Sequence, residues 1–525
     1  MIRLSQQKGV RKEWHLVKGD FDEKKIDEKL AGVRLEYVNK QLFLTNFPRT
    51  IFATSNRKLQ AHIRTTKKRL LASSISGYAL LFNDVLSSDY LTSIDPTKRQ
   101  RSFGHIPVMW AWIAQVLEGN ASCSKALGMI QSWYQSNGLS APKGGSAGYC
   151  LARGRLKESF LRKAASRTNA SLQRGIDPSN LWNGHVIKSI DGSSVLLMDT
   201  EANQLVYPQP SSQKPGCGFP AMGVVALLNH SHGGWEAFET CNARMRDTRV
   251  APRMLKHLDK GDVLLADRAF CSYEFIVQLI GKGAHCVMRL HQARHRKLDW
   301  RKGKKISRNE RIITWKKPKQ QPATSDLTKD QWDDLPAEMK LRYVRKPHTS
   351  RGGDTGYLIV VTDLLDHEKY CASEVLGLYG ERWEIELRFR DIKTTLGMEK
   401  LAVKTPEMAH KTLCVMMIAY NLVRSQMQEA AHMAKVTVWK PSFKAILDYI
   451  TSCHESLRSL AAKQRKLRAR LMEITRVCCQ KLIDTRPGRR EPRATKRRPK
   501  SYQLLTKPRH IFSEVPHRGN YYKTA

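Results

Sequence analysis

Hydrophobic residues between positions 105 and 170 recur at helical spacing. Ile106 to Leu117 is apolar over about three turns and ends at Gly119-Asn120, and a second helix is predicted from Ser122 to Ser136. A Pro/Gly loop at 142–146 then leads into a basic helix with four arginines, Arg153, Arg155, Arg162 and Arg167. Helices joined by short turns, one of them rich in arginine, are typical of a DNA-binding bundle and equally of a plain helical packing domain.

The apolar runs shorten to strand length from residue 185 onward. His185 to Asp191 and Ser194 to Asp199 are separated by Gly192-Ser193, which predicts a hairpin. The pattern also predicts strands over Ala221 to Asn229, Asp262 to Asp267 and Ala284 to Leu290, and a helix over Ser272 to Ile280. Strands that alternate with helices predict an α/β layer.

Residues 291–356 interrupt this layer and look like an insertion, because they are basic and polar. The strand pattern returns at Tyr357 to Thr362, and a long helix is predicted from Ser373 to Leu396. Helices are again predicted from Thr405 to Cys479, with breaks near Pro441 and Thr451.

These changes of pattern predict five segments. Residues 1–104 have no clear role, 105–178 form the helical domain that could bind DNA, and 179–400 form an α/β domain that contains the insertion at about 291–356. A C-terminal helical region at 401–485 precedes a basic tail at 486–525.

The charge of the chain points to its partner. The 525 residues include 90 Lys and Arg against 48 Asp and Glu, which leaves a net charge of +42. This surplus favours nucleic acid as a partner, and basic clusters such as Lys67-Lys68-Arg69 and Lys496-Arg497-Arg498 argue against a merely basic soluble protein. No run of about 18 apolar residues and no signal-peptide core occurs, so we expect a cytoplasmic protein without membrane contact.

The 11 cysteines are scattered along the chain, without a Cys-x-x-Cys pair or a Cys/His cluster at zinc spacing. Buried, reduced thiols are therefore expected, and no cysteine is a candidate nucleophile.

Two aspartates end predicted strands, Asp191 before Gly192 and Asp267 before Arg268. Carboxylates at the rim of an open α/β sheet could converge on a hard cation such as Mg²⁺, although each alone is more often a turn or cap residue. Three further acids at strand ends are assigned to turns or hairpins: Asp199, Asp262 and Asp363.

The helix predicted after Tyr357 to Thr362 carries a polar stripe. Tyr379, Arg382, Glu386 and Lys393 are spaced 3, 4 and 7 apart, so they share an arc of about 60°. One face thus combines a possible metal ligand with phosphate-binding groups. A solvated face with ion pairs such as Arg382 with Glu386 would give the same spacing.

The pattern Tyr-x2-Arg-x3-Glu-x6-Lys from Tyr379 resembles the signature of the DDE transposases of bacterial insertion sequences, and more narrowly the insertion-sequence-four family. Residues 190–193 (Ile-Asp-Gly-Ser) and 266–270 (Ala-Asp-Arg-Ala-Phe) are similar to the family's segments around the first and second Asp. Residues 215–220 (Pro-Gly-Cys-Gly-Phe-Pro) are similar to the loop between them.

The resemblance implies that the α/β domain at 179–400 is a ribonuclease-H-like catalytic core with a β-rich insertion, flanked by N- and C-terminal helical regions. Asp191, Asp267 and Glu386 would be the catalytic acids and would bind two Mg²⁺ ions, for which Mn²⁺ can substitute. Tyr379, Arg382 and Lys393, and with them Arg268, would hold DNA phosphates. One of Trp300, Trp315 and Trp332 could stack on a flipped base.

The predicted function is therefore a nucleoid-associated bacterial transposase. It would bind the terminal inverted repeats of its element and cut and join double-stranded DNA in a metal-dependent, cut-and-paste reaction. The family implies a homodimer that bridges two element ends in a synaptic complex. Two alternatives stay open: a catalytically inactive, transposase-derived DNA-binding protein, and a ribonuclease-H-like nuclease that only hydrolyses.

Overall fold

The structure is a computed structural model of the chain. It describes the residues 2–5, 13–16, 34–38, 41–45, 77–97, 103–136, 140–242, 245, 247–323, 325–349, 355–461, 463–484, 507–508 and 511. The basic clusters at 67–69 and 496–498 and nearly all of the predicted basic tail lie outside these residues.

The chain divides into two compact units. One contains the described residues within 1–115, 121–156 and 450–474, and the other those within 116–120, 157–449 and 475–525. All the acids and basic residues predicted for the site fall in the second unit.

The first unit is mainly helical. Its elements near the N-terminus are two antiparallel strand pairs, β1 (Ile2–Ser5) with β2 (Glu13–Leu16) and β3 (Arg34–Val38) with β4 (Gln41–Thr45). Its helices are α3 (Gly77–Leu81), α4 (Ser88–Ile94), most of α5 (His105–Leu117), α6 (Cys123–Ser136), α7 (Ala147–Arg155), α18 (Glu455–Arg458) and most of α19 (Gln464–Cys479). Trp110 and Trp112 of α5 are buried, and the Tyr149 hydroxyl of α7 donates to Gln115 at 3.1 Å.

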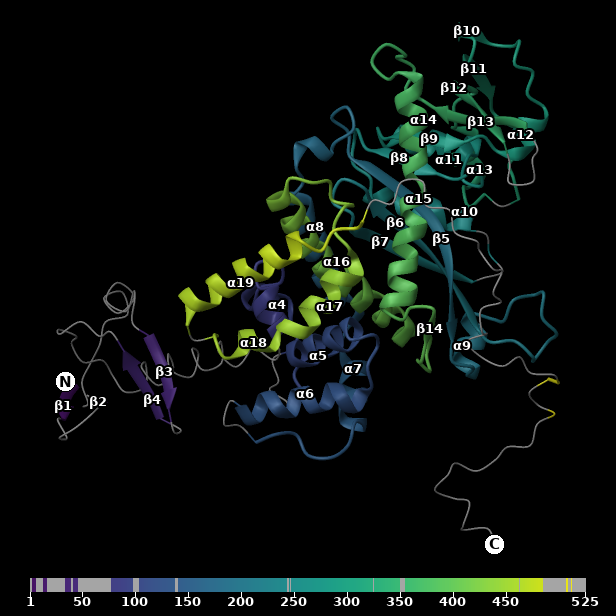
Figure 1. Ribbon diagram of the computed structural model, residues 1–525. Coiled ribbons are helices and arrows are strands. Elements are labelled where there is room, and N and C mark those ends of the chain that lie inside the picture. The colour runs from purple at the N-terminus through teal and green to yellow at the C-terminus, as the bar shows by residue number, and fades with distance from the viewer. Residues whose placement is uncertain are drawn as a thin grey trace. The chain divides into compact units, whose positions relative to one another are not determined.

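The second unit is built on one ten-stranded mixed sheet (Figure 1). Along the sheet the order is β10 (Lys304–Ser307), β11 (Glu310–Lys316), β12 (Glu338–Thr349), β13 (Thr355–Thr362), β9 (His285–Arg289), β8 (Val263–Ala266), β5 (Ile187–Leu197), β6 (Ala221–Asn229) and β7 (Trp235–Asn242). The short β14 (Lys400–Leu401) pairs with the end of β5. Strands β9, β8 and β5 are parallel neighbours, which places their carboxyl ends at one edge.

Helices cover this sheet on both faces, as the α/β pattern predicts. The helices that lie between or directly after these strands in the sequence are α9 (Glu201–Val206), α10 (Asp247–Val250), α11 (Tyr273–Gly281), α12 (Gln292–Arg296), α13 (Lys329–Asp333), α14 (Ala372–Glu381) and α15 (Trp383–Arg390). One apolar core packs α11 and the 3₁₀ helix 251–257 against residues such as Ile190 and Leu264, and the other packs α14 against Ile187 and Leu265. Each strand thus sends alternate side chains into the two cores.

Three more helices belong wholly or partly to this unit: α8 (Glu158–Arg174), α16 (Pro406–Ala434) and the first part of α17 (Phe443–Cys453). Thr405 caps α16 by accepting from the Met408 N–H at 3.3 Å, and Lys435 ends it in the left-handed conformation. The basic helix predicted after residue 146 is in fact two helices, α7 and α8, because the backbone is extended at Leu156 and Lys157. The break predicted near Thr451 is confirmed, since α17 ends at Cys453 and α18 begins at Glu455.

The predicted hairpin at 185–199 is wrong. Residues 187–197 form the single strand β5, and Gly192 pairs with Val225 of β6 in the middle of it. Asp191 therefore lies inside a strand and not at its end. Gly192 stays in the strand because the Asp247 carboxylate fills the space of its missing side chain, with Oδ2 1.9 Å from where a Cβ would lie.

The single helix predicted over Ser373 to Leu396 has three parts. Helices α14 and α15 meet at Arg382, where the bonds from Arg382 N to Tyr379 O and from Ile385 N to Arg382 O span three residues instead of four. A π-helical turn at Asp391–Thr395 follows, with a wider bond from Leu396 N to Asp391 O. Because of these changes of winding, the stripe of Tyr379, Arg382, Glu386 and Lys393 does not follow the uniform helical spacing from which it was predicted.

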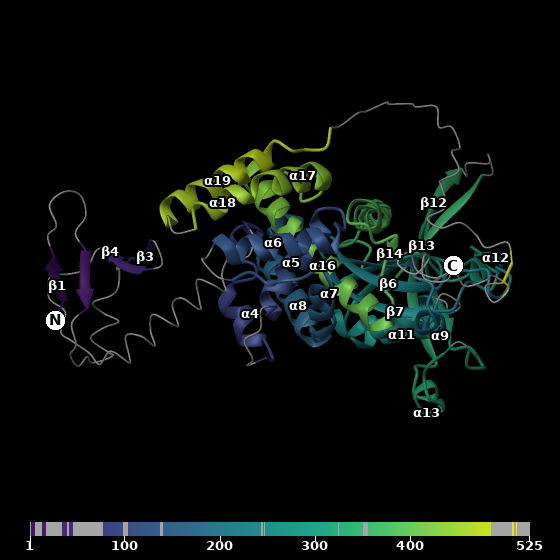
Figure 2. The ribbon, with the colours of Figure 1, turned by 90° about the horizontal axis from the view of Figure 1, so that it is seen from below.

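The predicted insertion contains strands, as the resemblance implies, and they extend the main sheet. Strand β12 forms a long antiparallel ribbon with β13 (Figure 2), and β13 pairs directly with β9. The buried Arg342 of β12 is bonded to Glu310 of β11 and donates to the Tyr370 carbonyl at 2.6 Å. In the part of the chain that the structure describes, no helix is long and apolar enough to span a membrane.

The turn between β6 and β7 offers a test of packing. Gly233 has a positive φ of 71°, and a Cβ there would lie 1.8 Å from Nη2 of the fully buried Arg424. We expect Gly233→Ala to lower the free energy of unfolding by about 2–4 kcal/mol, from backbone strain and overpacking. Chemical denaturation measures this. Gly281→Ala is the control, because nothing lies within 4 Å of its Cβ position, and it should cause no loss.

Candidate active site

The register of three parallel strands brings predicted site residues to one level. Ile187 to Ser189 of β5 pair with Val263 to Leu265 of β8, residues 76 positions later, and the same offset relates Asp191 to Asp267. Val263 to Ala266 pair with His285 to Met288 of β9, and the same offset relates Asp267 to Arg289. The two aspartates and Arg289 therefore stand side by side at the edge where β8 ends.

Arg382 joins Asp191 to Glu386. Its guanidinium lies 3.5 Å from Asp191 Oδ2 and 2.8 Å from Glu386 Oε1. Asp191 and Ser189 share one face of β5, which is the face that α15 covers. The ion pair that spacing alone suggested between Arg382 and Glu386 is thus present, and it extends to the first aspartate.

Electrostatics shows that the acids lie close to one another. The pKa of Asp191 is raised to about 6, chiefly by burial; the Gly192 N–H and the Arg382 guanidinium lower it, and the negative charges of Asp267 and Glu386 contribute to the rise. Asp191 thus interacts through space with both of the other predicted catalytic acids. A hard cation would relieve this crowding of carboxylates, and oxygen donors are the ligands that Mg²⁺ prefers.

Tyr379 also faces this group. Burial raises the pKa of its hydroxyl, Arg382 and Arg289 lower it, and Asp267 raises it. Asp267 itself is oriented by the Ala269 N–H, which donates to its Oδ1 at 2.8 Å. Five of the residues named from the sequence, Asp191, Asp267, Tyr379, Arg382 and Glu386, therefore lie near one another in the structure.

Two predicted residues are less closely tied to the site. Lys393 lies on the π-helical turn after α15, and Arg268 is exposed directly after Asp267. Among the described residues, no three His, Cys, Asp or Glu side chains are close enough together to hold a metal ion. The carboxylate oxygens of the three acids are the donors that a hard cation prefers. The distances between these acids would have to shorten before they could bind one ion together.

Two neighbours of the site were not predicted from the sequence. Arg289 ends β9, and the end of this third strand was a signal that could have found it. Asp247 lies against Gly192, and burial and then the charge of Asp267 raise its pKa. Its contact with β5 depends on α10, which begins 55 residues farther along the chain than Gly192, and the sequence holds no local signal for this contact.

The acids assigned to turns lie apart from this group. Asp363 accepts from His285 Nδ1 and the Cys286 N–H, each at 2.7 Å, and Asp199 accepts from Gln204 at 2.9 Å. Asp262 accepts the Asp259 N–H in a turn and also binds Lys188 at 2.8 Å. Each of these three acids thus has hydrogen-bond partners of its own outside the group of Asp191, Asp267 and Glu386.

A cleft of about 780 Å³ opens beside the site. Ala269, two residues after Asp267, lines it, together with the insertion residues Trp315 and Trp332. Arg294 lies over the Trp315 ring at 3.6 Å, and the Trp315 N–H donates to Tyr343 at 2.6 Å. Trp300 is not among the lining residues and packs instead against Arg345, at 4.1 Å.

The contact of Gly192 with Asp247 gives a second prediction. Gly192→Ala should lower the free energy of unfolding by about 1–3 kcal/mol, because its methyl group would overlap the Asp247 carboxylate. Measured by denaturant unfolding, this cost should largely vanish when Asp247→Ala is already present. An equal cost in both backgrounds would show that the contact with Asp247 is not its cause.

Comparison with known proteins agrees with this geometry. The family model described as "Transposase DDE domain" matches residues 182–422, which include every residue of the site. The chain is 24% identical over 423 residues to the transposase InsG of insertion sequence element IS4 from Escherichia coli K12, covering 78% of this chain and 89% of that protein. It is also 34% identical over 68 residues to a putative transposase InsL of element IS186A and to the transposase of element IS421, both from Escherichia coli, covering 13% of this chain and 18% of each. The match over the sheet and its helices, with the similarity over most of the chain, supports a DDE transposase of an insertion-sequence-four-type element.

Proposed function

We propose that the protein binds the terminal inverted repeats of its own element and catalyses metal-dependent strand cleavage and strand transfer, so that the element moves by cut and paste. The observation that carries this proposal is the register that sets Asp191 level with Asp267 on adjacent parallel strands, with Glu386 joined to Asp191 through Arg382. The catalytic region would have the ribonuclease-H-like fold that the family implies.

Asp191, Asp267 and Glu386 would hold two divalent ions, Mg²⁺ or in its place Mn²⁺. When bound, such ions activate a water or 3′-hydroxyl nucleophile and stabilise the leaving oxygen. The raised pKa of Asp191 supports this role, because uncompensated carboxylates in a partly buried site favour a cation. For the three acids to act as ligands, Arg382 would have to release Asp191 and Glu386.

The cationic residues would bind the DNA backbone. Once released, the Arg382 guanidinium could bind a phosphate in bidentate fashion, and Arg289 stands at the same edge of the sheet. Lys393 and Arg268 would add further phosphate contacts, and the Tyr379 hydroxyl would position the phosphate beside the acids. These groups act by holding and neutralising the substrate next to the carboxylates.

The cleft lined by Trp315 and Trp332 would receive an unstacked base from the cut end. Its lining combines the almost wholly buried Trp315 and Trp332 with cationic side chains, including Arg294 and Lys297, and a base would stack on Trp315 in the place that Arg294 now occupies. The partners would be the double-stranded ends of the element and the target DNA, bound by a homodimer in a synaptic complex on the bacterial nucleoid. The net charge of +42 supports such a polyanionic partner.

Glu386→Gln tests the catalytic role. The change removes a ligand charge at nearly constant shape, so cleavage of a labelled element-end duplex in Mg²⁺ should fall by about 10²–10³-fold while DNA affinity is kept. Glu384→Gln is the matched control, because Glu384 lies on the same helix but pairs with Arg388. Equal cutting by wild type and Glu386→Gln would contradict the assignment. With a second, unlabelled duplex present, joined products distinguish strand transfer from hydrolysis alone.

Replacing a cleft tryptophan tests base flipping. With 2-aminopurine near the cut end, Trp315→Leu should reduce the fluorescence rise on binding and weaken end binding by about 1–3 kcal/mol, because a stacking platform is lost. Trp300→Leu should leave both unchanged, since Trp300 does not line the cleft. An unchanged signal in a folded Trp315→Leu protein would show that no base enters there.

A further inference from the structure

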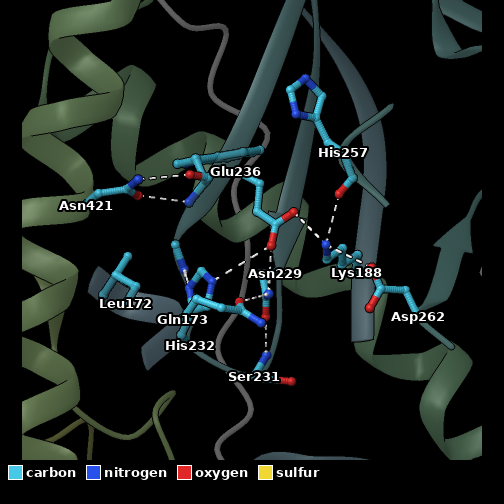
Figure 3. Close-up of polar contacts among 12 residues, drawn as sticks. Leu172, Gln173, Lys188, Asn229, Ser231, His232, Glu236, His257, Asp262 and Asn421 are labelled. Carbon is cyan, nitrogen blue, oxygen red and sulfur yellow. Dashed lines mark hydrogen bonds and ion pairs between the residues drawn. The ribbon is translucent and has the colours of Figure 1, made fainter. Parts of the chain in front are cut away.

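A buried cluster of charged side chains is centred on Lys188, which lies three residues before Asp191 on β5. The Lys188 ammonium has three acceptors, Glu236 Oε2 at 2.8 Å, Asp262 Oδ2 at 2.8 Å and the His257 carbonyl at 2.9 Å (Figure 3). The three charged side chains are 3–6% exposed. An ammonium has three N–H donors, so each donor of Lys188 has one acceptor, and the three acceptors come from three separate segments of the chain.

The surroundings of the cluster are also ordered. Glu236 accepts from Asn229 at 2.8 Å through its other oxygen, and Asp262 accepts the Asp259 N–H. Burial lowers the pKa of Lys188, but Glu236 and Asp262 outweigh it and leave the pKa above its ordinary value, so the side chain is charged. A buried ion cluster of this kind usually stabilises a protein little more than apolar side chains of the same volume would. The cluster is therefore better explained by the positions in which it holds the strands.

The geometry of the cluster bears on the register of β5 against β8. The ladder between these strands pairs only Ile187 to Ser189 with Val263 to Leu265. Lys188 lies within this ladder, and its partner Asp262 directly precedes β8. A slip of two residues would keep each side chain on its face but would move Asp191 about 6.6 Å relative to Asp267.

We propose that Lys188 is a positioning residue, which, through its ion pair with Asp262, locks β5 and β8 in the register that sets Asp191 beside Asp267 for metal binding. The Lys188 side chain leaves β5 on the face opposite to the one that Arg382 contacts, since residues 188 and 191 of the strand point to opposite sides. Its pair with Glu236 of β7 anchors the ammonium but spans no part of the β5–β8 ladder. The proposal rests on the proposed function, in which the two aspartates bind metal.

Two charge-neutral variants of the full chain separate the two ion pairs. Asp262→Asn weakens the link to β8, and Glu236→Gln weakens the link to β7, each at nearly constant shape. Binding of Mn²⁺, measured by electron paramagnetic resonance without DNA, should weaken about tenfold in Asp262→Asn and less than about threefold in Glu236→Gln. In cleavage assays, kcat should fall in the first variant while KM for the element end stays within about twofold of wild type.

A variant in which all three charged side chains are replaced by apolar ones tests the role of the charges, because it leaves no carboxylate without a partner. Lys188→Met, Glu236→Met and Asp262→Leu together should leave thermal stability near that of wild type, while Mn²⁺ binding and kcat fall by about tenfold or more. A folded triple variant with wild-type Mn²⁺ affinity would overturn the proposal. So would equal effects of Asp262→Asn and Glu236→Gln, which can be measured even if the triple variant does not fold.

Asp191→Asn in the wild-type background shows which hypothesis fails. If this change leaves Mn²⁺ binding intact, the metal-binding role of Asp191 is wrong, and the proposed function fails with it. If Asp191→Asn abolishes binding while Asp262→Asn does not change it, the positioning role of Lys188 alone is wrong.

Discussion

The arrangement of the site depends on one constraint, the parallel register of β5, β8 and β9. Hydrogen bonds between strands fix which residues stand level, and the register of the paired residues, continued along the strands, sets Asp191, Asp267 and Arg289 level where β8 ends. The apolar cores on the two faces keep this register, because a slip of one residue would turn every buried side chain toward the wrong core. Helices α14 and α15 then add Tyr379, Arg382 and Glu386 from one face.

A second constraint is electrostatic. Bringing carboxylates together in a partly buried place is unfavourable, as the raised pKa of Asp191 indicates, and the Arg382 guanidinium offsets part of this cost. The same guanidinium suits a DNA phosphate. The balance of charge in the site therefore links the positions of the acids to the group that would bind the substrate.

Much of this could be predicted from the sequence, for identifiable reasons. The apolar runs at 221–229 and 284–290 are long and unambiguous, so β6 and β9 were predicted nearly as they are. The fixed spacing of Tyr379, Arg382 and Glu386 survives the junction between α14 and α15 because that junction remains helical in its dihedral angles. Gly192-Ser193 was taken for a turn because local propensity cannot reveal that a distant carboxylate, Asp247, packs onto the glycine. Lys393 lies within a π-helical turn, whose winding departs from the regular period of an α-helix.

The insertion starts after β9 and ends at β13, and these two strands are neighbours in the sheet. Leu290 N, just after β9, is bonded to the Ile359 carbonyl of β13 at 2.9 Å, so the two ends of the intervening segment are already held together by the sheet itself. Changing the length of such a segment costs little loop-closure entropy, since its ends need no further closure. Related chains could thus gain, lose or exchange this segment during evolution while β5 and β8 keep their register, and selection could reshape the cleft lined by Trp315 and Trp332 independently of the carboxylates.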